Sequence, residues 1–176
     1  MLSYSQESAK DSPLQVFDYY MGVWLLPSDH PGVLRNPILA DLQVINFSWG
    51  KQKKLIHSST GIVSVNKKIP FSEGIITVNP TTKSITWLEY QYEGDLLFEG
   101  EYIPLDNGSL QRLYTVRYVE GDKTIPNPDE PGWSRLYRET FIPFSKDTID
   151  WVTETYIDGK WIEAGTPGGS SAVRKK

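Results

Sequence analysis

The sequence predicts an all-β fold: a single antiparallel up-and-down β-barrel of about ten strands, preceded by a short helix. Three observations predict it. Apolar and polar residues alternate with period two along most of the 176-residue chain. Turn-forming residues interrupt this alternation at short, regular intervals. The segments between these turns are too short for the helical crossovers that parallel strands need.

The predicted strands are separated by turn sequences such as Asn79-Pro80, Asp106-Asn107-Gly108 and Asp158-Gly159. Connections of hairpin length join neighbouring strands of an antiparallel meander. The runs rich in β-branched and aromatic residues are Val23–Leu26, Ala40–Phe47, Lys54–Val65, Ser72–Val78, Ser84–Tyr90, Leu96–Ile103, Leu110–Val119, Ser134–Pro143, Thr148–Tyr156 and Lys160–Glu163.

One helix is expected near the start of the chain. Ser12 is suited to the N-cap and Pro13 to the first helical position. Leu14 and Phe17 then begin a short apolar stripe, and Gly22 ends the helix.

Residues 1–164 are expected to form one β-barrel domain. Residues 165–176 are rich in glycine and serine and end on three basic residues, so they predict a flexible C-terminal tail. Two Pro-rich connections are too long for tight turns. Pro27–Pro37 is interpreted with equal weight as a lid or a surface insertion, and Gly121–Gly132 as a surface insertion.

Composition excludes several classes of protein. A net charge of −4 gives no general attraction to nucleic acid or acidic membranes, so neither is expected as a partner. The absence of cysteine removes disulfides, thiolate catalysis and thiolate zinc sites. The N-terminus is polar, and the chain lacks an apolar run long enough to span a bilayer, so a soluble cytoplasmic protein is expected.

The predicted helix leads into Gly22-Val23-Trp24, a Gly-x-Trp sequence that opens the meander. From about Phe17 to Glu163 the chain resembles the calycins, the superfamily of lipocalins, fatty-acid-binding proteins and nitrobindins. It looks most like bacterial lipocalin-like families whose function is unassigned. The resemblance implies a ligand-binding barrel whose closed end is plugged by Trp24. Further segments that carry the likeness are Ser72–Thr77, Phe98–Tyr102 and Asp147–Val152.

The sequence departs from two of these families. Nitrobindin-like proteins hold haem iron with a histidine far along the chain, whereas the two histidines here are His30 and His57. Fatty-acid-binding proteins carry a two-helix lid, and Pro27–Pro37 has too many prolines for two helices, so any lid is expected to be a loop. Because the two histidines lie in unlike contexts, no metal and no cofactor are predicted.

Candidate ligand contacts are polar and aromatic side chains within the strands. Arg112, Tyr114 and Tyr118 share one strand face, where a guanidinium and a phenol could grip one anionic head group. The pair is similar to the Arg-x-Tyr with which fatty-acid-binding proteins hold a carboxylate in their last strand. The alternative is an Arg112 that lies over the outer sheet surface. The residues expected to contact a small-molecule ligand are Arg112, Tyr114, Tyr118, Phe98, Tyr102, His57 and Trp151.

The predicted function is binding of a small, partly apolar ligand inside the barrel. The ligand could also carry a negative charge. A second hypothesis is a small cofactor-independent enzyme, isomerase- or cyclase-like, in which tyrosine, glutamate or His57 moves a proton on a lipophilic metabolite. A third is an interaction protein whose barrel is filled by its own side chains. Glu99 and Glu101 share a face and form a candidate acid–base pair, although a solvated outer face is favoured. A dry cavity of ~300 Å³ would cost about 7 kcal/mol, so such a cavity should hold water or ligand.

Overall fold

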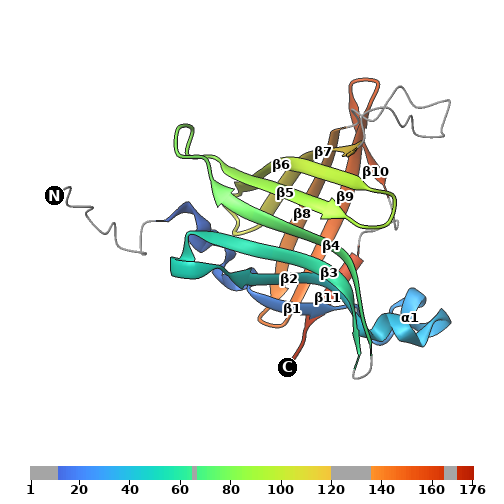
Figure 1. Cartoon of the computed structure of the whole chain (residues 1–176). Coiled ribbons are helices and arrows are strands. Elements are labelled where there is room, and N and C mark those ends of the chain that lie inside the picture. Colours follow the sequence, from blue (N-terminus) through green and yellow to red (C-terminus); the bar gives the residue numbers. More distant parts are fainter. Residues whose placement is uncertain (1–11, 65–66, 120–135, 165–169) are drawn as a thin grey trace.

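The structure is a computed structural model of the whole chain, and it describes residues 12–64, 67–119, 136–164 and 170–176. One antiparallel sheet rolls into a closed barrel (Figure 1). Its strands are β1 (Gly22–Leu25), β2 (Leu42–Trp49), β3 (Leu55–Ser64), β4 (Lys67–Val78), β5 (Ile85–Gln91), β6 (Leu96–Pro104), β7 (Leu110–Tyr118), β8 (Leu136–Ser145), β9 (Thr148–Ile157), β10 (Lys160–Ala164) and β11 (Ser170–Arg174).

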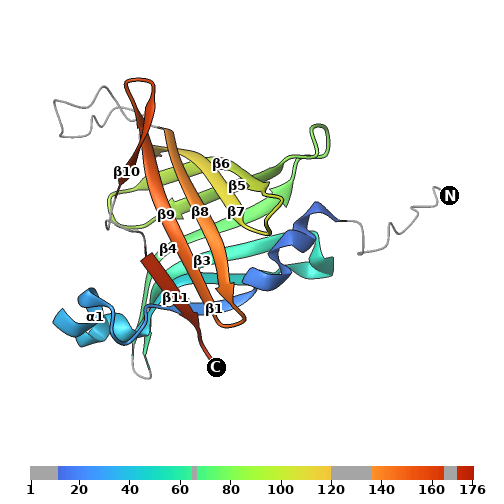
Figure 2. The same ribbon diagram turned by 180° about the vertical axis from the view of Figure 1, so that it is seen from behind.

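Strand β9 closes the ring. One edge of β9 pairs with β8, and its other edge is shared between two short strands. Its first half, Thr148–Trp151, pairs with β11, and its second half, Thr153–Ile157, pairs with β10. Strand β11 then pairs with β1, so ten strands form the ring and β10 lies beside it (Figure 2). The predicted antiparallel barrel is therefore confirmed.

The prediction of a flexible tail is wrong for residues 170–174. They form β11, between β1 and β9, and Ala172 within it is fully buried. The run Ser170-Ser171-Ala172 has little intrinsic strand preference, and hydrogen bonding to two exposed strand edges stabilises it instead. Residues 165–169 lie outside the described part of the chain.

The predicted N-terminal helix is present as a 3₁₀ helix, η2 (Pro13–Tyr20). The Ser12 hydroxyl accepts a hydrogen bond from the Leu14 N–H at 3.3 Å, so Ser12 is the N-cap. The helix buries Phe17 edge-on against the rings of Tyr102 and Phe47, with centroids 4.9 and 5.6 Å away. These contacts fill one end of the barrel interior with aromatic rings.

Trp24 is fully buried, as its predicted role as a plug requires. Its Nε1 donates to the Tyr20 carbonyl oxygen at 2.9 Å. The Arg174 guanidinium lies 4.1 Å from the Trp24 ring centre and donates to the carbonyl oxygens of Met21 and Tyr19 at 2.5 and 2.6 Å. Strand β11 is thus anchored to the residues on both sides of the start of β1.

The connection Pro27–Pro37 contains helix α1 (Pro31–Arg35) and leads into a 3₁₀ turn, η3 (Pro37–Asp41). The sequence predicts that any lid here is a loop, whereas the segment contains one five-residue helix. Pro31 and Pro37 occupy the first turns of α1 and η3, where the missing N–H is tolerated. Helix α1 stands away from the barrel wall in both ribbon views, and the predicted insertion Gly121–Gly132 lies outside the described residues.

Within the described ranges, no helix is both long and apolar enough to cross a lipid bilayer.

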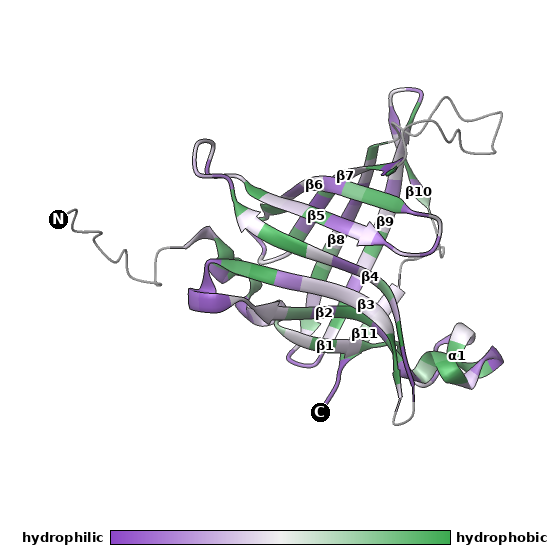
Figure 3. Ribbon diagram, in the orientation of Figure 1, coloured by the Kyte–Doolittle hydropathy of each residue, from purple (hydrophilic) through white to green (hydrophobic). Residues whose placement is uncertain are grey.

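Hydrophilic and hydrophobic residues follow one another along the strands (Figure 3). Successive side chains of a strand point to opposite faces of the sheet, so one set lies inside the barrel and the other outside. Gly100 on β6 lies between Trp87 on β5 and Tyr114 on β7. A Cβ at Gly100 would overlap the Leu113 carbonyl oxygen and lie 2.6 Å from the Tyr114 Cβ. Because Gly100 is bare, the rings of its two cross-strand neighbours, Trp87 and Tyr114, meet edge-on at 5.4 Å. Trp87 is thereby fixed beside the polar cluster described next.

Candidate functional site

The centre of the barrel interior holds an ion pair. Arg112 on β7 and Glu139 on β8 are cross-strand partners, and the Arg112 Nη2 donates to the Glu139 Oε2. Their side chains are only 16% and 13% exposed. The Tyr114 hydroxyl donates to the other carboxylate oxygen, Oε1, at 3.1 Å. Both oxygens of the Glu139 carboxylate are therefore engaged by the protein.

Aromatic rings surround the Arg112 guanidinium. It lies 3.9 Å from the Trp87 ring centre, and its Nη1 donates to the Tyr102 hydroxyl at 3.3 Å. Burial lowers the pKa of Arg112, but Glu139 together with Tyr102, Tyr114 and Glu89 more than offsets this and holds the pKa above its ordinary value. Arg112 is therefore a permanent cation within the barrel.

A second carboxylate, Glu89 on β5, faces the same region. Its Oε1 accepts from the Ser72 hydroxyl at 2.6 Å. Its Oε2 accepts from the Ser58 hydroxyl at 3.0 Å and from the Trp87 Nε1 at 3.2 Å. Three donors from β3, β4 and β5 thus stabilise a half-buried carboxylate.

Two interior tyrosines remain neutral. Burial raises the pKa of Tyr102 and of Tyr114 above the ordinary tyrosine value. For Tyr114, the charge of Glu139 raises it further. Each hydroxyl keeps its proton at neutral pH, and that of Tyr114 serves as a hydrogen-bond donor to Glu139.

A cavity of about 120 Å³ adjoins these groups. It is smaller than the ~300 Å³ at which ligand pockets usually begin. Arg112 Nε is buried and has no hydrogen-bond partner among the described residues. The cavity is lined by Val44, Ile45, Phe47, Ser58, Ser59, Thr60, Glu89, Arg112, Glu139, Phe141 and Trp151.

The structure brings together most of the residues predicted to contact a ligand. Arg112 and Trp151 line the cavity. Tyr102 and Tyr114 contact Arg112, and the Phe98 ring lies 6.0 Å from that of Tyr114. Tyr118 ends strand β7, and its side chain lies outside the described part of the structure.

Arg112 and Tyr114, which were predicted to bind the acid group of a ligand, instead bind an acid group of the protein itself. The carboxylate that both side chains contact is that of Glu139, from the neighbouring strand. The two residues therefore act as the counter-ion and donor of an internal carboxylate. A ligand's acid group would have to displace Glu139 to take its place.

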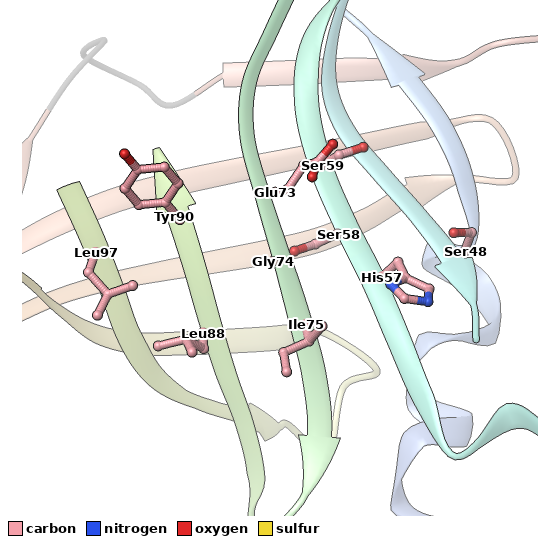
Figure 4. A pocket seen from close by; sticks show the side chains of 10 residues that line it. All are labelled: Ser48, His57, Ser58, Ser59, Glu73, Gly74, Ile75, Leu88, Tyr90 and Leu97. Atoms are coloured by element: carbon pink, nitrogen blue, oxygen red, sulfur yellow. The ribbon is translucent and has the colours of Figure 1, made fainter. Parts of the chain in front are cut away.

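His57 is not part of this cluster. It is exposed on the outer face of the barrel, where it lines a groove of about 470 Å³. Figure 4 shows His57 and Ser48 at one side of this groove and Leu88 and Leu97 at the other. The groove is open, and Leu88, which lines it, is 41% exposed.

Glu99 and Glu101 are also outer-face residues. Both are exposed, and Glu99 accepts a hydrogen bond from Arg117 Nε at 2.8 Å. The interpretation of this face as solvated is confirmed, and neither carboxylate reaches the interior cluster.

Sequence reasoning missed three residues that define the site: Glu139, Glu89 and Trp87. A signal for the two carboxylates was present. Glu139 shares its strand face with Tyr137 and Phe141, and Glu89 shares its face with Trp87. A carboxylate that alternates in step with aromatic residues indicates a buried, hydrogen-bonded acid.

The described residues bring no three histidines or acidic residues together in a group that could hold a metal ion. No family model matches the chain, and no curated protein and no solved structure matches it either. The closed ten-strand antiparallel barrel is consistent with a calycin-like barrel.

Proposed function

We propose that the protein binds a small, partly apolar molecule inside the barrel, against the Arg112–Glu139 pair. Such a role fits the resemblance to the calycins, to which we propose the chain belongs. The predictions of a cytoplasmic location and of no nucleic-acid partner stay predictions.

One observation carries the proposal: the charged side chains of Arg112, Glu89 and Glu139 line a cavity of about 120 Å³ together with aromatic rings. These polar groups can hydrogen-bond to the polar part of a bound molecule. The rings of Phe47, Phe141 and Trp151 supply apolar wall for the rest of the molecule.

Binding is favoured over acid–base catalysis because of how the carboxylates are held. Glu89 accepts three hydrogen bonds, and Glu139 is engaged at both oxygens. His57, the proposed imidazole base of the enzyme hypothesis, lines the outer groove instead.

The test is a nuclear magnetic resonance screen with neutral fragments about the size of benzene, which fits a cavity of similar volume. Binding inside the barrel should shift the backbone amide signals of Ile45, Arg112 and Trp151. Signals from the outer groove, such as that of Leu88, should stay in place.

Two matched variants locate the site. Ile45→Phe adds bulk at the cavity wall and should abolish the fragment shifts, whereas Ile75→Phe makes the same change in the outer groove and should leave them unchanged. Loss of binding in Ile75→Phe, with binding retained in Ile45→Phe, would place the ligand outside the barrel and overturn the proposal. The absence of shifts with every fragment would do the same.

A further inference from the structure

We infer that the ligand of the interior cavity is a small organic cation, with a primary alkylammonium ion as the best chemical fit. This inference rests on the proposed function, because it assigns the chemistry of a molecule bound at that same cavity. It departs from the expectation that the ligand could carry a negative charge.

The charges in the cavity wall favour a cation. Arg112 and Glu139 are in direct contact, so this pair carries no net charge. Glu89 lines the cavity as well, and two carboxylates against one guanidinium give the described wall a formal charge of −1. Because the effective dielectric of a partly buried site is lower than that of water, this charge attracts a cation and repels an anion more strongly there.

The hydroxyl groups beside Glu89 are oriented so that they can only accept. Ser58 and Ser72 each donate their one hydroxyl hydrogen to Glu89, at 3.0 and 2.6 Å. Thr60 and Ser72 share a hydrogen bond of 2.8 Å, and Thr60 is its donor because the Ser72 hydrogen is already used. Ser58 and Thr60, which line the cavity, therefore offer lone pairs and no hydroxyl hydrogen. A polar group that meets them has to be a donor, as an ammonium group is.

The cationic side chain of the described wall is already engaged by the protein. Arg112 Nη2 donates to the Glu139 carboxylate, and Nη1 donates to the Tyr102 hydroxyl at 3.3 Å. An anion bound to this guanidinium would compete with Glu139 and would lie in the field of both carboxylates. A cation requires no such exchange of partners.

Aromatic rings provide a wall for the apolar part of the ligand. Phe141 and Trp151 are cross-strand neighbours on β8 and β9, and both line the cavity together with Phe47. The faces of aromatic rings attract alkylammonium ions and also pack against their methyl groups. The volume of about 120 Å³ is slightly below the ~150 Å³ of a cavity that holds benzene, so the ligand has only a few carbon atoms.

Three probes matched in size and branched shape test this assignment at neutral pH: isopropylammonium, isopropanol and acetate. The first is a cation, the second is neutral and the third is an anion. Affinities are measured on the wild-type protein by titration of the Arg112 and Trp151 amide signals at low ionic strength. Isopropylammonium should bind at least about tenfold more tightly than isopropanol, and acetate should bind most weakly.

The variant Glu89→Gln tests the electrostatic reason. It removes one negative charge from the cavity wall and retains a side-chain oxygen that can accept from Ser58 or Ser72. Isopropylammonium affinity should fall about tenfold, while isopropanol affinity changes less than about threefold. Glu101→Gln makes the same charge change on the outer face and should leave the three affinities unchanged.

The outcomes separate this inference from the proposed function. If none of the probes binds, and the neutral fragment screen also fails, the cavity is not a ligand site and both fall. If the fragments bind but isopropylammonium does not, or if isopropanol or acetate binds most tightly, the assignment is overturned and the binding function stands. Equal losses of isopropylammonium and isopropanol affinity in Glu89→Gln would overturn it too. If Glu89→Gln does not fold, the wild-type ranking of the three probes decides the question alone.

Discussion

The guanidinium group of Arg174 lies 4.1 Å from the centre of the Trp24 indole ring, and this contact joins the last strand of the ring to the first. Arg174 also donates two hydrogen bonds to the backbone carbonyls of Tyr19 and Met21, which precede β1. The Arg174 side chain therefore both holds β11 in the ring and packs against Trp24 at the aromatic end of the barrel.

Trp24→Ala should lower the free energy of unfolding by about 3–5 kcal/mol, the usual cost of removing a fully buried aromatic side chain. Urea unfolding followed by circular dichroism measures it. Phe144→Ala is the control, because Phe144 is 73% exposed and should cost less than about 0.5 kcal/mol. Equal losses in the two variants would contradict the plug.

Arg174→Ala should destabilise the protein by about 2–4 kcal/mol, because it removes two charge-assisted hydrogen bonds and the stacking on Trp24. The neighbouring substitution Lys175→Ala removes an exposed charge and should have almost no effect. Thermal unfolding of both variants provides the comparison. A flexible tail would make them indistinguishable.

Arg112→Met should destabilise the fold by about 3–5 kcal/mol, because it leaves the Glu139 carboxylate buried without its cation. Adding Glu139→Leu should recover much of this loss, since apolar pairs often replace buried ion pairs at little cost. A double-mutant cycle in urea measures the coupling. Additive losses would show that the two side chains do not act as a pair.

Alkaline pH should unfold the protein through its buried tyrosines. Burial raises the pKa of Tyr20, Tyr102 and Tyr114 in the folded state. The unfolded chain loses these protons at about pH 10, so it binds fewer protons than the folded chain above that pH. Stability is thus fully present below about pH 10 and falls as the pH rises further.

An ultraviolet titration of tyrosinate checks this expectation. The three buried tyrosines should ionise only together with unfolding, and Tyr114→Phe should remove one equivalent from that late step. Ionisation of all ten tyrosines while the protein remains folded would refute it.

Gly100→Ala should cost about 1–3 kcal/mol or more, because a methyl group there overlaps the Leu113 carbonyl oxygen and separates Trp87 from Tyr114. Glu101→Ala, at the next position and on the outer face, is the matched control. Unfolding midpoints and the near-ultraviolet signal of Trp87 report the outcome. An unchanged signal would show that the two rings do not depend on the bare backbone.

Much of the fold was predictable because local signals and tertiary structure agree. Turn residues such as Asp158-Gly159 mark the ends of hairpins, and Ser12-Pro13 marks the start of η2. Strand β11 was not predictable from local signals. Its stability comes from pairing with β1 and β9, which are distant in sequence, and from the Arg174 contacts.

The site was predictable only in part. Period-two alternation placed Arg112 and Tyr114 on one face, and both point inward. Alternation alone does not say which face is inner, so His57 was included although it lies outside. The register between β7 and β8 makes Glu139 the cross-strand partner of Arg112. A long connection joins these two strands, so the sequence of neither strand alone predicts this register.

The division of the β9 edge between β10 and β11 makes ring closure a late event in folding. Arg174 forms the hydrogen bonds that seal the ring with Met21 and Tyr19, which lie 153 and 155 positions earlier in the sequence. These bonds therefore form only after most of the meander has been ordered. Until then β1 and β9 present unpaired edges to other chains. Refolding at high concentration should therefore yield strand-exchanged dimers in which β11 of one molecule completes the ring of another.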